Sequence, residues 1–157
     1  MKIAIDPGGN GAIAVKMNDG RMKHYNTPDK FADCVALLLS LASREVLQRS
    51  QVVLEDLNVK GLPLDRAKTM LGEYFKWVYV LQSLDVHPQM VAPNAWQARF
   101  IRVYGRIPKG KENYGDRKRY IFDAMARRYP TIQPALTIRN ADAVAILDVM
   151  TCSPLDL

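Results

Sequence analysis

Three short strand-forming segments lie within the first 25 residues, and they constrain the fold more than any other feature of the chain. Residues 2–6 alternate like a strand, residues 12–15 resume strand character after a glycine-rich turn, and residues 22–25 follow a second turn at 18–20. Glycine and asparagine readily adopt the backbone conformations that tight turns between antiparallel strands need. The sequence therefore predicts three consecutive antiparallel strands, of which the first ends on Asp6.

The rest of the chain alternates between helical and strand patterns. A helical pattern opens at Pro28 and ends before Ser50, and a strand follows over residues 51–55. Further helices are predicted from Asp65 as cap to about Ser83, from Pro93, from Asp116 to Tyr129 and from Asn140 to Met150, with a short strand in 86–91 and a loop over 105–115. This order predicts one α/β domain over residues 1–157, with helices packed on a mixed sheet.

The basic character of the chain is concentrated in one segment. The net charge is +6, but ten basic and only three acidic residues lie between Arg99 and Arg128. A local excess of this kind is typical of proteins that bind phosphate backbones, although a solvated helix face is the plainer alternative.

The hydrophobic content of 48% and the absence of a long apolar run indicate a soluble protein without a membrane span. The first residues enter a strand at once, so we expect no leader peptide and a cytoplasmic location.

Three acids stand at the ends of predicted elements. Asp6 ends the first strand, Glu55 ends the fourth, and Asp142 lies in the first turn of the last helix. Oxygen ligands on rigid elements suit Mg²⁺ or Mn²⁺, and two such ions can activate water and stabilise a leaving oxygen at a phosphodiester. Each acid taken alone is more simply a surface charge or a helix cap. Their joint placement is what favours a metal site.

Four segments together resemble a known family. They are residues 3–12 (IAIDPGGNGA), 52–55 (VVLE), 93–96 (PNAW) and 141–145 (ADAVA), and their order and spacing are similar to those of RuvC-like Holliday-junction resolvases of the bacteriophage type. The resemblance implies an RNase H-like fold with a mixed five-stranded sheet and helices on both faces. It also implies a homodimer that makes paired, metal-dependent nicks in branched DNA, in the bacterial host cytoplasm if the protein is phage-encoded.

The resemblance assigns roles to individual residues. Asp6, Glu55 and Asp142 correspond to metal ligands for two Mg²⁺ or Mn²⁺ ions, and Lys118 corresponds best to the lysine near the scissile phosphate, with Lys109 and Lys111 as alternatives. The family's fourth acid is replaced here by Arg139. Asn140 could coordinate through its carbonyl oxygen, which leaves the fourth ligand open. The DNA-binding candidates are Arg106, Lys109, Lys111, Arg117 and Lys118.

Two further segments bear on substrate and partner. Resolvases that distort junctions can carry an aromatic residue after the second acid, but residues 56–59 are Asp-Leu-Asn-Val. Forks and flaps are therefore plausible substrates beside four-way junctions. The helix predicted to end near Ser83 is apolar on nearly all sides, which favours a dimer interface through Trp77, Val80 and Leu84 over burial within the same chain.

Two other functions compete with an endonuclease. A non-catalytic protein that binds branched DNA would use the basic segment alone and leave the three acids without a role. An ATP-binding protein of the same superfamily would need a second domain to close over the nucleotide, and the chain lacks a second glycine-rich hairpin. We expect no organic cofactor.

Overall fold

A five-stranded mixed sheet forms the centre of the molecule. The computed structural model describes residues 1–8, 10–106 and 114–151. The strands are β1 (Lys2–Asp6), β2 (Ala12–Lys16), β3 (Met22–Asn26), β4 (Gln51–Glu55) and β5 (Gln89–Val91), in the order β3-β2-β1-β4-β5. The first three strands pair antiparallel, whereas β4 runs parallel to both β1 and β5. The predicted mixed sheet is confirmed.

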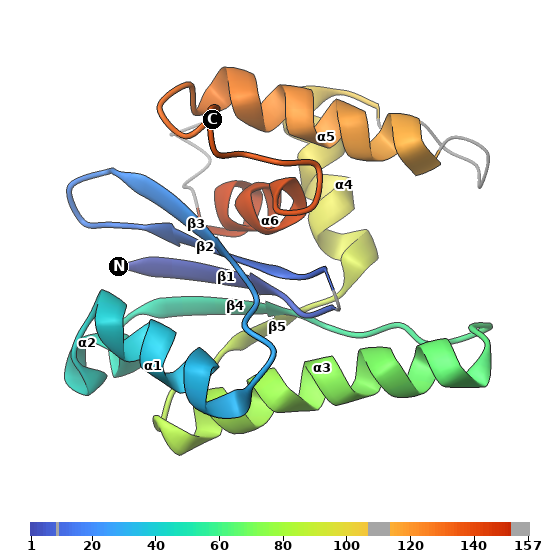
Figure 1. Ribbon diagram of the computed structural model, residues 1–157. Helices are drawn as coiled ribbons and strands as arrows, with labels where there is room; N and C mark the ends of the chain where they lie inside the picture. Colours follow the sequence, from blue (N-terminus) through green and yellow to red (C-terminus); the bar gives the residue numbers. More distant parts are fainter. Residues whose placement is uncertain (9, 107–113, 152–157) are drawn as a thin grey trace.

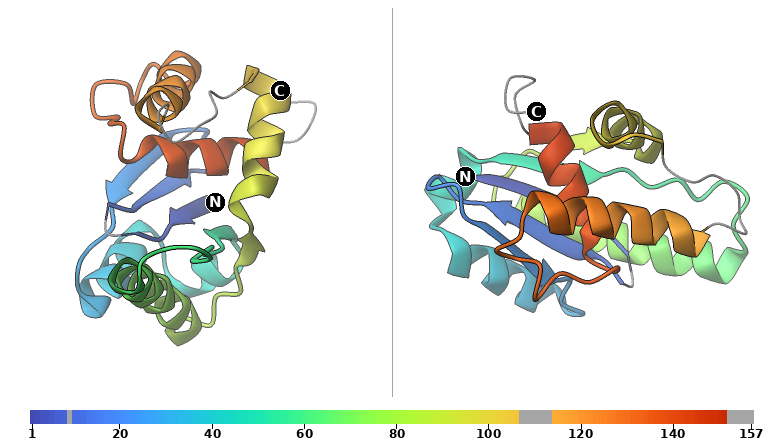
Figure 2. Two further views of the ribbon diagram at one scale, coloured as in Figure 1. Left: turned by 90° about the vertical axis from the view of Figure 1, so that its right-hand side faces the viewer. Right: turned by 90° about the horizontal axis from the view of Figure 1, so that it is seen from above.

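Helices cover both faces of the sheet (Figures 1 and 2). One face carries α1 (Phe31–Leu41), α2 (Arg44–Gln48) and α3 (Leu64–Ser83), and the other carries α4 (Pro93–Tyr104), α5 (Tyr114–Arg128) and α6 (Ala141–Thr151). Within the described residues, none of these helices has the length and apolar character that crossing a membrane requires.

Several predicted boundaries were wrong. The helix expected up to Ser50 is interrupted, because Ala42 has an extended backbone and Ser43 caps a separate α2. This break lets Leu47 of α2 join the same core as Leu38 of α1. The short strand expected within residues 86–91 was found at 89–91, consistent with Pro88, which has no N–H to donate to a neighbouring strand.

Helix starts also shifted slightly. Helix α5 begins at Tyr114, two residues before the predicted Asp116. Helix α3 begins at Leu64 after Pro63, so Asp65 lies in its first turn and does not cap it. Neither shift changes the order of elements.

The two faces of the sheet have different packing. Ile3, Ile5 and Leu54 point into the core under α1 and α3, while Ala4 and Val53 point into the core under α4, α5 and α6. Successive side chains of a strand alternate between faces. Ala4, Ala12 and Ala14 present a smooth surface to α6, whose side chains are all buried. Small residues on this face therefore leave room for α6 to pack directly on the sheet.

Candidate active site

The strand register brings Asp6 and Glu55 together. Because β1 and β4 are parallel and pair Ile5 with Leu54, the next residue on each strand is an acid, and both acids lie at the same edge of the sheet. Asp6 follows the alternation of Ala4, and Glu55 follows that of Val53. Both carboxylates therefore point to the face that α4, α5 and α6 cover.

Two helices complete the site on this face. Asp142 lies in the first turn of α6, and Lys118 lies in the N-terminal half of α5. The Lys118 ammonium group donates a hydrogen bond to Oδ2 of Asp142, forming a mostly buried ion pair. The other carboxylate oxygen of Asp142, Oδ1, is buried without a hydrogen-bond partner among the described residues. Asp142 thus keeps one oxygen for a further ligand.

A tryptophan holds Glu55 in place. The indole N–H of Trp96, on α4, donates a hydrogen bond of 2.7 Å to Oε1 of Glu55. Trp96 is buried and packs edge-on against Phe100. Its ring therefore serves the core while its N–H fixes the orientation of a site carboxylate, a role that the sequence analysis did not assign.

Burial and mutual repulsion perturb the acids. Burial, together with the nearby charges of Glu55 and Asp142, raises the pKa of Asp6 well above its usual range, while Lys118 opposes the shift. Burial also raises the pKa of Glu55, although the hydrogen bond from Trp96 opposes this. The cluster thus holds more negative charge than its own cation balances. Strongly shifted pKa values of this kind are typical of functional sites.

The donor set fits a divalent cation in part. Asp6 and Glu55 lie close enough to share a hydrogen bond, and Oδ1 of Asp142 is unsatisfied. Carboxylate oxygens in excess of nearby cations are what Mg²⁺ and Mn²⁺ bind. Among the described residues, however, no three His, Cys, Asp or Glu side chains form a ready-made metal-binding group. Lys118 holds Asp142 and Trp96 holds Glu55, so a shared ion would require these side chains to adjust.

A cleft opens beside the acids. It has a volume of about 640 Å³ and is bordered by Asp6 and the turn that follows β1, by the first two turns of α3, by Lys118, and by Ile138 and Arg139 just before α6. The acid cluster therefore has a route to solvent, and Lys118 lies between the cleft and Asp142.

Comparisons with known proteins bear on this arrangement. The chain matches no family model and no curated protein sequence. Two solved structures of Thermus thermophilus RuvC each match 92% of this chain and 90% of their own. One, in complex with Holliday junction substrate, has 12% sequence identity and a TM-score of 0.51, and the other has 15% identity and a TM-score of 0.42.

The chain has a RuvC-like fold. The match with a TM-score of 0.51 shows this likeness, and it confirms the α/β architecture that the resemblance implied. At 12% identity, the likeness extends to the fold alone. The roles of individual residues in this RuvC-like fold therefore depend on the geometry described above.

The structure does not support Asn140 as a metal ligand. Its side-chain oxygen accepts a hydrogen bond of 2.7 Å from the backbone N–H of Thr137, and its amide nitrogen lies 3.0 Å from Nδ1 of His24 on β3. Both ends of the amide are engaged, and the residue is buried. Asn140 therefore fixes the turn before α6, and a fourth ligand at this position stays a prediction.

The three residues predicted to form a dimer interface are buried within the chain. Trp77, Val80 and Leu84 are at most 1% exposed and belong to the core between α3 and the sheet. Residues buried within one chain cannot contact a second copy. The exposed aromatic residues of α3 are Phe75 and Tyr79, whose ring centroids lie 6.3 Å apart.

The predicted DNA-binding residues fall into two groups. Arg106, just after α4, is exposed, while Arg117 and Lys118 are partly buried on α5. Lys109 and Lys111 lie outside the described residues. Of the five, Lys118 alone borders the cleft in the part of the chain that the structure describes.

A second buried acid on α6 was not predicted from the sequence. Asp148 is fully buried and accepts hydrogen bonds from the hydroxyl groups of Tyr104 and Tyr129. The only signal in the sequence is a single charge in the otherwise apolar run 143–150. Tyr104 is thereby tied to the interior.

Proposed function

We propose that this chain is a metal-dependent endonuclease that nicks branched DNA. The observation that carries the proposal is the convergence of Asp6, Glu55 and Asp142, from β1, β4 and α6, around Lys118 beside an open cleft. A buried cluster with three acids and one lysine is costly unless it has a cationic ligand, because unpaired buried charge is destabilising. Metal-assisted phosphodiester hydrolysis needs acids that bind a divalent cation next to a site open to substrate, and this cluster supplies both.

Each residue of the cluster has a distinct part in this chemistry. Asp6, Glu55 and Asp142 would hold Mg²⁺ or Mn²⁺, which supplies an activated water molecule and stabilises the leaving oxygen. Trp96 keeps the Glu55 carboxylate oriented. Lys118 lies at the cleft and can move its hydrogen bond from Asp142 to a phosphate oxygen, where its charge stabilises the negative charge that develops during cleavage.

Branched DNA is the substrate that the charge distribution and the fold together favour. The exposed arginines Arg99, Arg102, Arg106, Arg119 and Arg127 lie on and between α4 and α5. Arginines on these two helices can contact phosphates on more than one duplex arm. A RuvC structure of the same fold is a complex with Holliday junction substrate. We include forks and flaps among the substrates because residues 56–59 carry no aromatic side chain.

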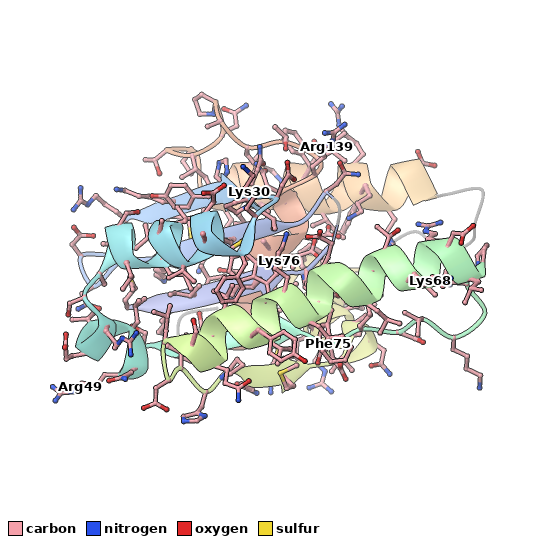
Figure 3. All side chains as sticks on the ribbon, turned by 60° about the horizontal axis from the view of Figure 1, so that its bottom comes forward. Lys30, Arg49, Lys68, Phe75, Lys76 and Arg139 are labelled. Carbon is pink, nitrogen blue, oxygen red and sulfur yellow. The ribbon has the colours of Figure 1, made fainter. Side chains whose placement is uncertain are left out.

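A homodimer is part of the proposal because a four-way junction has two equivalent strands to cut. The surface for it would be the outer side of α3, where Phe75 is 46% and Tyr79 58% exposed (Figure 3 labels Phe75). Sedimentation of the protein with and without junction DNA would test this part separately.

The main test is cleavage of four-way, three-way and linear substrates in Mg²⁺, Mn²⁺ or EDTA. We expect metal-dependent nicks in the branched substrates, reduced about a thousand-fold in Asp6→Asn, the order of loss seen when charge stabilisation at a reacting centre is removed. Asp33→Asn is the matched control, because Asp33 is an exposed acid on α1, across the sheet. Binding without nicking in either metal would instead support the non-catalytic alternative, and full activity of Asp6→Asn would refute the assigned site.

A further inference from the structure

Two arginines from distant parts of the sequence border the cleft. Arg66 lies in the first turn of α3, and Arg139 lies two residues before α6. The acid Asp6 and the Lys118 ammonium border the same cleft. The cleft next to the acid cluster therefore carries a second set of cationic groups, which the proposed chemistry has not used.

Neither arginine is engaged by the part of the chain that the structure describes. Arg66 and Arg139 are exposed, and they make no ion pair or side-chain hydrogen bond with residues 1–8, 10–106 or 114–151. Other arginines do, since Arg21 pairs with Asp19 and Arg119 with Asp123. Asp65 borders the cleft beside Arg66, yet the structure has no ion pair between them. The two guanidinium groups are thus available to an anionic ligand.

The remaining surface of the cleft suits a nucleotide unit. Met70 and Ile138 add apolar surface beside the arginines, and Ile138 is 42% exposed. The volume of 640 Å³ lies within the range of about 300–1,000 Å³ typical of small-molecule sites. Guanidinium groups bind phosphate oxygens in a bidentate manner, and apolar side chains pack against sugar or base. A phosphodiester with its sugar matches both features.

We propose that Arg66 and Arg139 bind a DNA phosphate next to the one that is cut, and so position the strand for cleavage. The proposal rests on the proposed function, and it adds a phosphate subsite to it. It also gives Arg139 a role at the position where the family resemblance implies an acid. A cation there repels a further metal ion and attracts the substrate phosphate directly.

Binding in EDTA tests the subsite without cleavage. The affinity of each variant for a four-way junction would be measured over a range of salt concentrations. We expect Arg66→Ala and Arg139→Ala each to weaken binding about tenfold, the size typical of a lost charge-assisted hydrogen bond. Each should also reduce the dependence of log affinity on log salt by about one phosphate contact. Lys68→Ala is the matched control, because Lys68 is exposed on the same helix but does not border the cleft.

Neutral DNA linkages locate the contact. Single methylphosphonates would be moved along the strands that flank the branch point. We expect one position to weaken binding of the unmodified protein about tenfold and to have no further effect on the double variant Arg66→Ala/Arg139→Ala. Thermal unfolding would verify that the variants are folded. Affinities equal to that of Lys68→Ala, or additive losses at every linkage, would overturn the subsite.

The two proposals can fail separately. Normal nicking in Mg²⁺ with unchanged binding of both arginine variants would overturn the subsite and leave the endonuclease intact. A clear loss of binding in these variants, in a protein that nicks no substrate with either metal, would refute the endonuclease while the phosphate contact stands.

Discussion

The two ends of α6 each carry a buried aspartate, and the two are held very differently. Asp148 is fully buried, and both of its oxygens accept hydrogen bonds from tyrosine hydroxyl groups. The guanidinium group of Arg128 adds an ion pair at 3.8 Å. Asp142 is 7% exposed, yet among residues 1–8, 10–106 and 114–151 only one of its oxygens has a partner, the ammonium group of Lys118. One acid is satisfied by the fold, and the other is not.

This is the difference expected between a structural acid and an acid with the metal-binding role that we propose for Asp142. A buried carboxylate with all of its hydrogen bonds made is stable as it stands, whereas an unsatisfied oxygen is costly unless a ligand completes it. Asp148 joins α6 to Tyr104 at the end of α4 and to Arg128 and Tyr129 at the end of α5. It thereby fixes the helix whose first turn presents Asp142. The contacts of Asp148 therefore help to hold Asp142 in place at the start of the helix.

The largest expected contrast is in cleavage. Asp142→Asn should reduce nicking of branched DNA about a thousand-fold, because it removes the charge beside Lys118 that we propose to bind metal. Asp148→Asn should keep activity within about threefold at a temperature where it is folded, because the amide still accepts from one hydroxyl group. Single-turnover rates on a labelled four-way junction would measure both. Equal losses in the two variants would remove the distinction between the acids.

For the free energy of unfolding, replacing Asp148 should have a larger effect than replacing Asp142. Asp148→Ala removes the acceptor of two partly buried tyrosine hydroxyl groups and the ion-pair partner of Arg128, so we expect a loss of about 3 kcal/mol in the free energy of unfolding. Asp142→Ala, measured in EDTA, should cost less, because the loss of its ion pair with Lys118 is offset by the removal of an unsatisfied buried oxygen and of a charge that repels Asp6. Urea unfolding would give both values. A larger loss for Asp142→Ala would show that its ion pair with Lys118 is structural.

The sequence predicted the parts of this site that depend on local pattern. Asp6 and Glu55 end strands whose alternation is legible in the sequence, and a parallel pairing of those strands places them side by side. Asp142 follows from the start of a helix. The mixed α/β architecture was also accessible from the order of strands and helices, whereas the RuvC-like form of the fold was implied by the resemblance of four short segments.

The contacts that complete the site are long-range, and no local pattern encodes them. The bond from Trp96 to Glu55 joins residues 41 positions apart, and that from Tyr104 to Asp148 joins residues 44 apart. The apolar run on α3 indicated burial but not its direction, so Trp77 was assigned to a partner when it faces the sheet. Asn140 has the chemistry of a ligand, but His24 on β3 engages it.

The smallest expected effect is a pH dependence of stability that arises at the acid cluster beside Asp142 and not at Asp148. Burial raises the pKa values of Asp6 and Glu55, so the folded protein retains their protons at pH values where the unfolded chain has lost them. Without metal, stability should therefore fall as pH rises from the usual carboxyl range through the raised pKa values. Mg²⁺ competes with these protons, so the stabilisation it provides should grow over the same interval.

Thermal unfolding in EDTA and in Mg²⁺ across this pH range would measure the effect, which we expect to be a few degrees, since about 1 kcal/mol shifts the midpoint by roughly 2–4 °C in a chain of this size. Asp6→Asn should flatten both curves because the amide cannot ionise. Asp148→Asn should lower both curves while the difference between them keeps its pH dependence. A stabilisation by Mg²⁺ that is the same at every pH, or that survives in Asp6→Asn, would place the metal away from this cluster and leave the unsatisfied oxygen of Asp142 to another ligand.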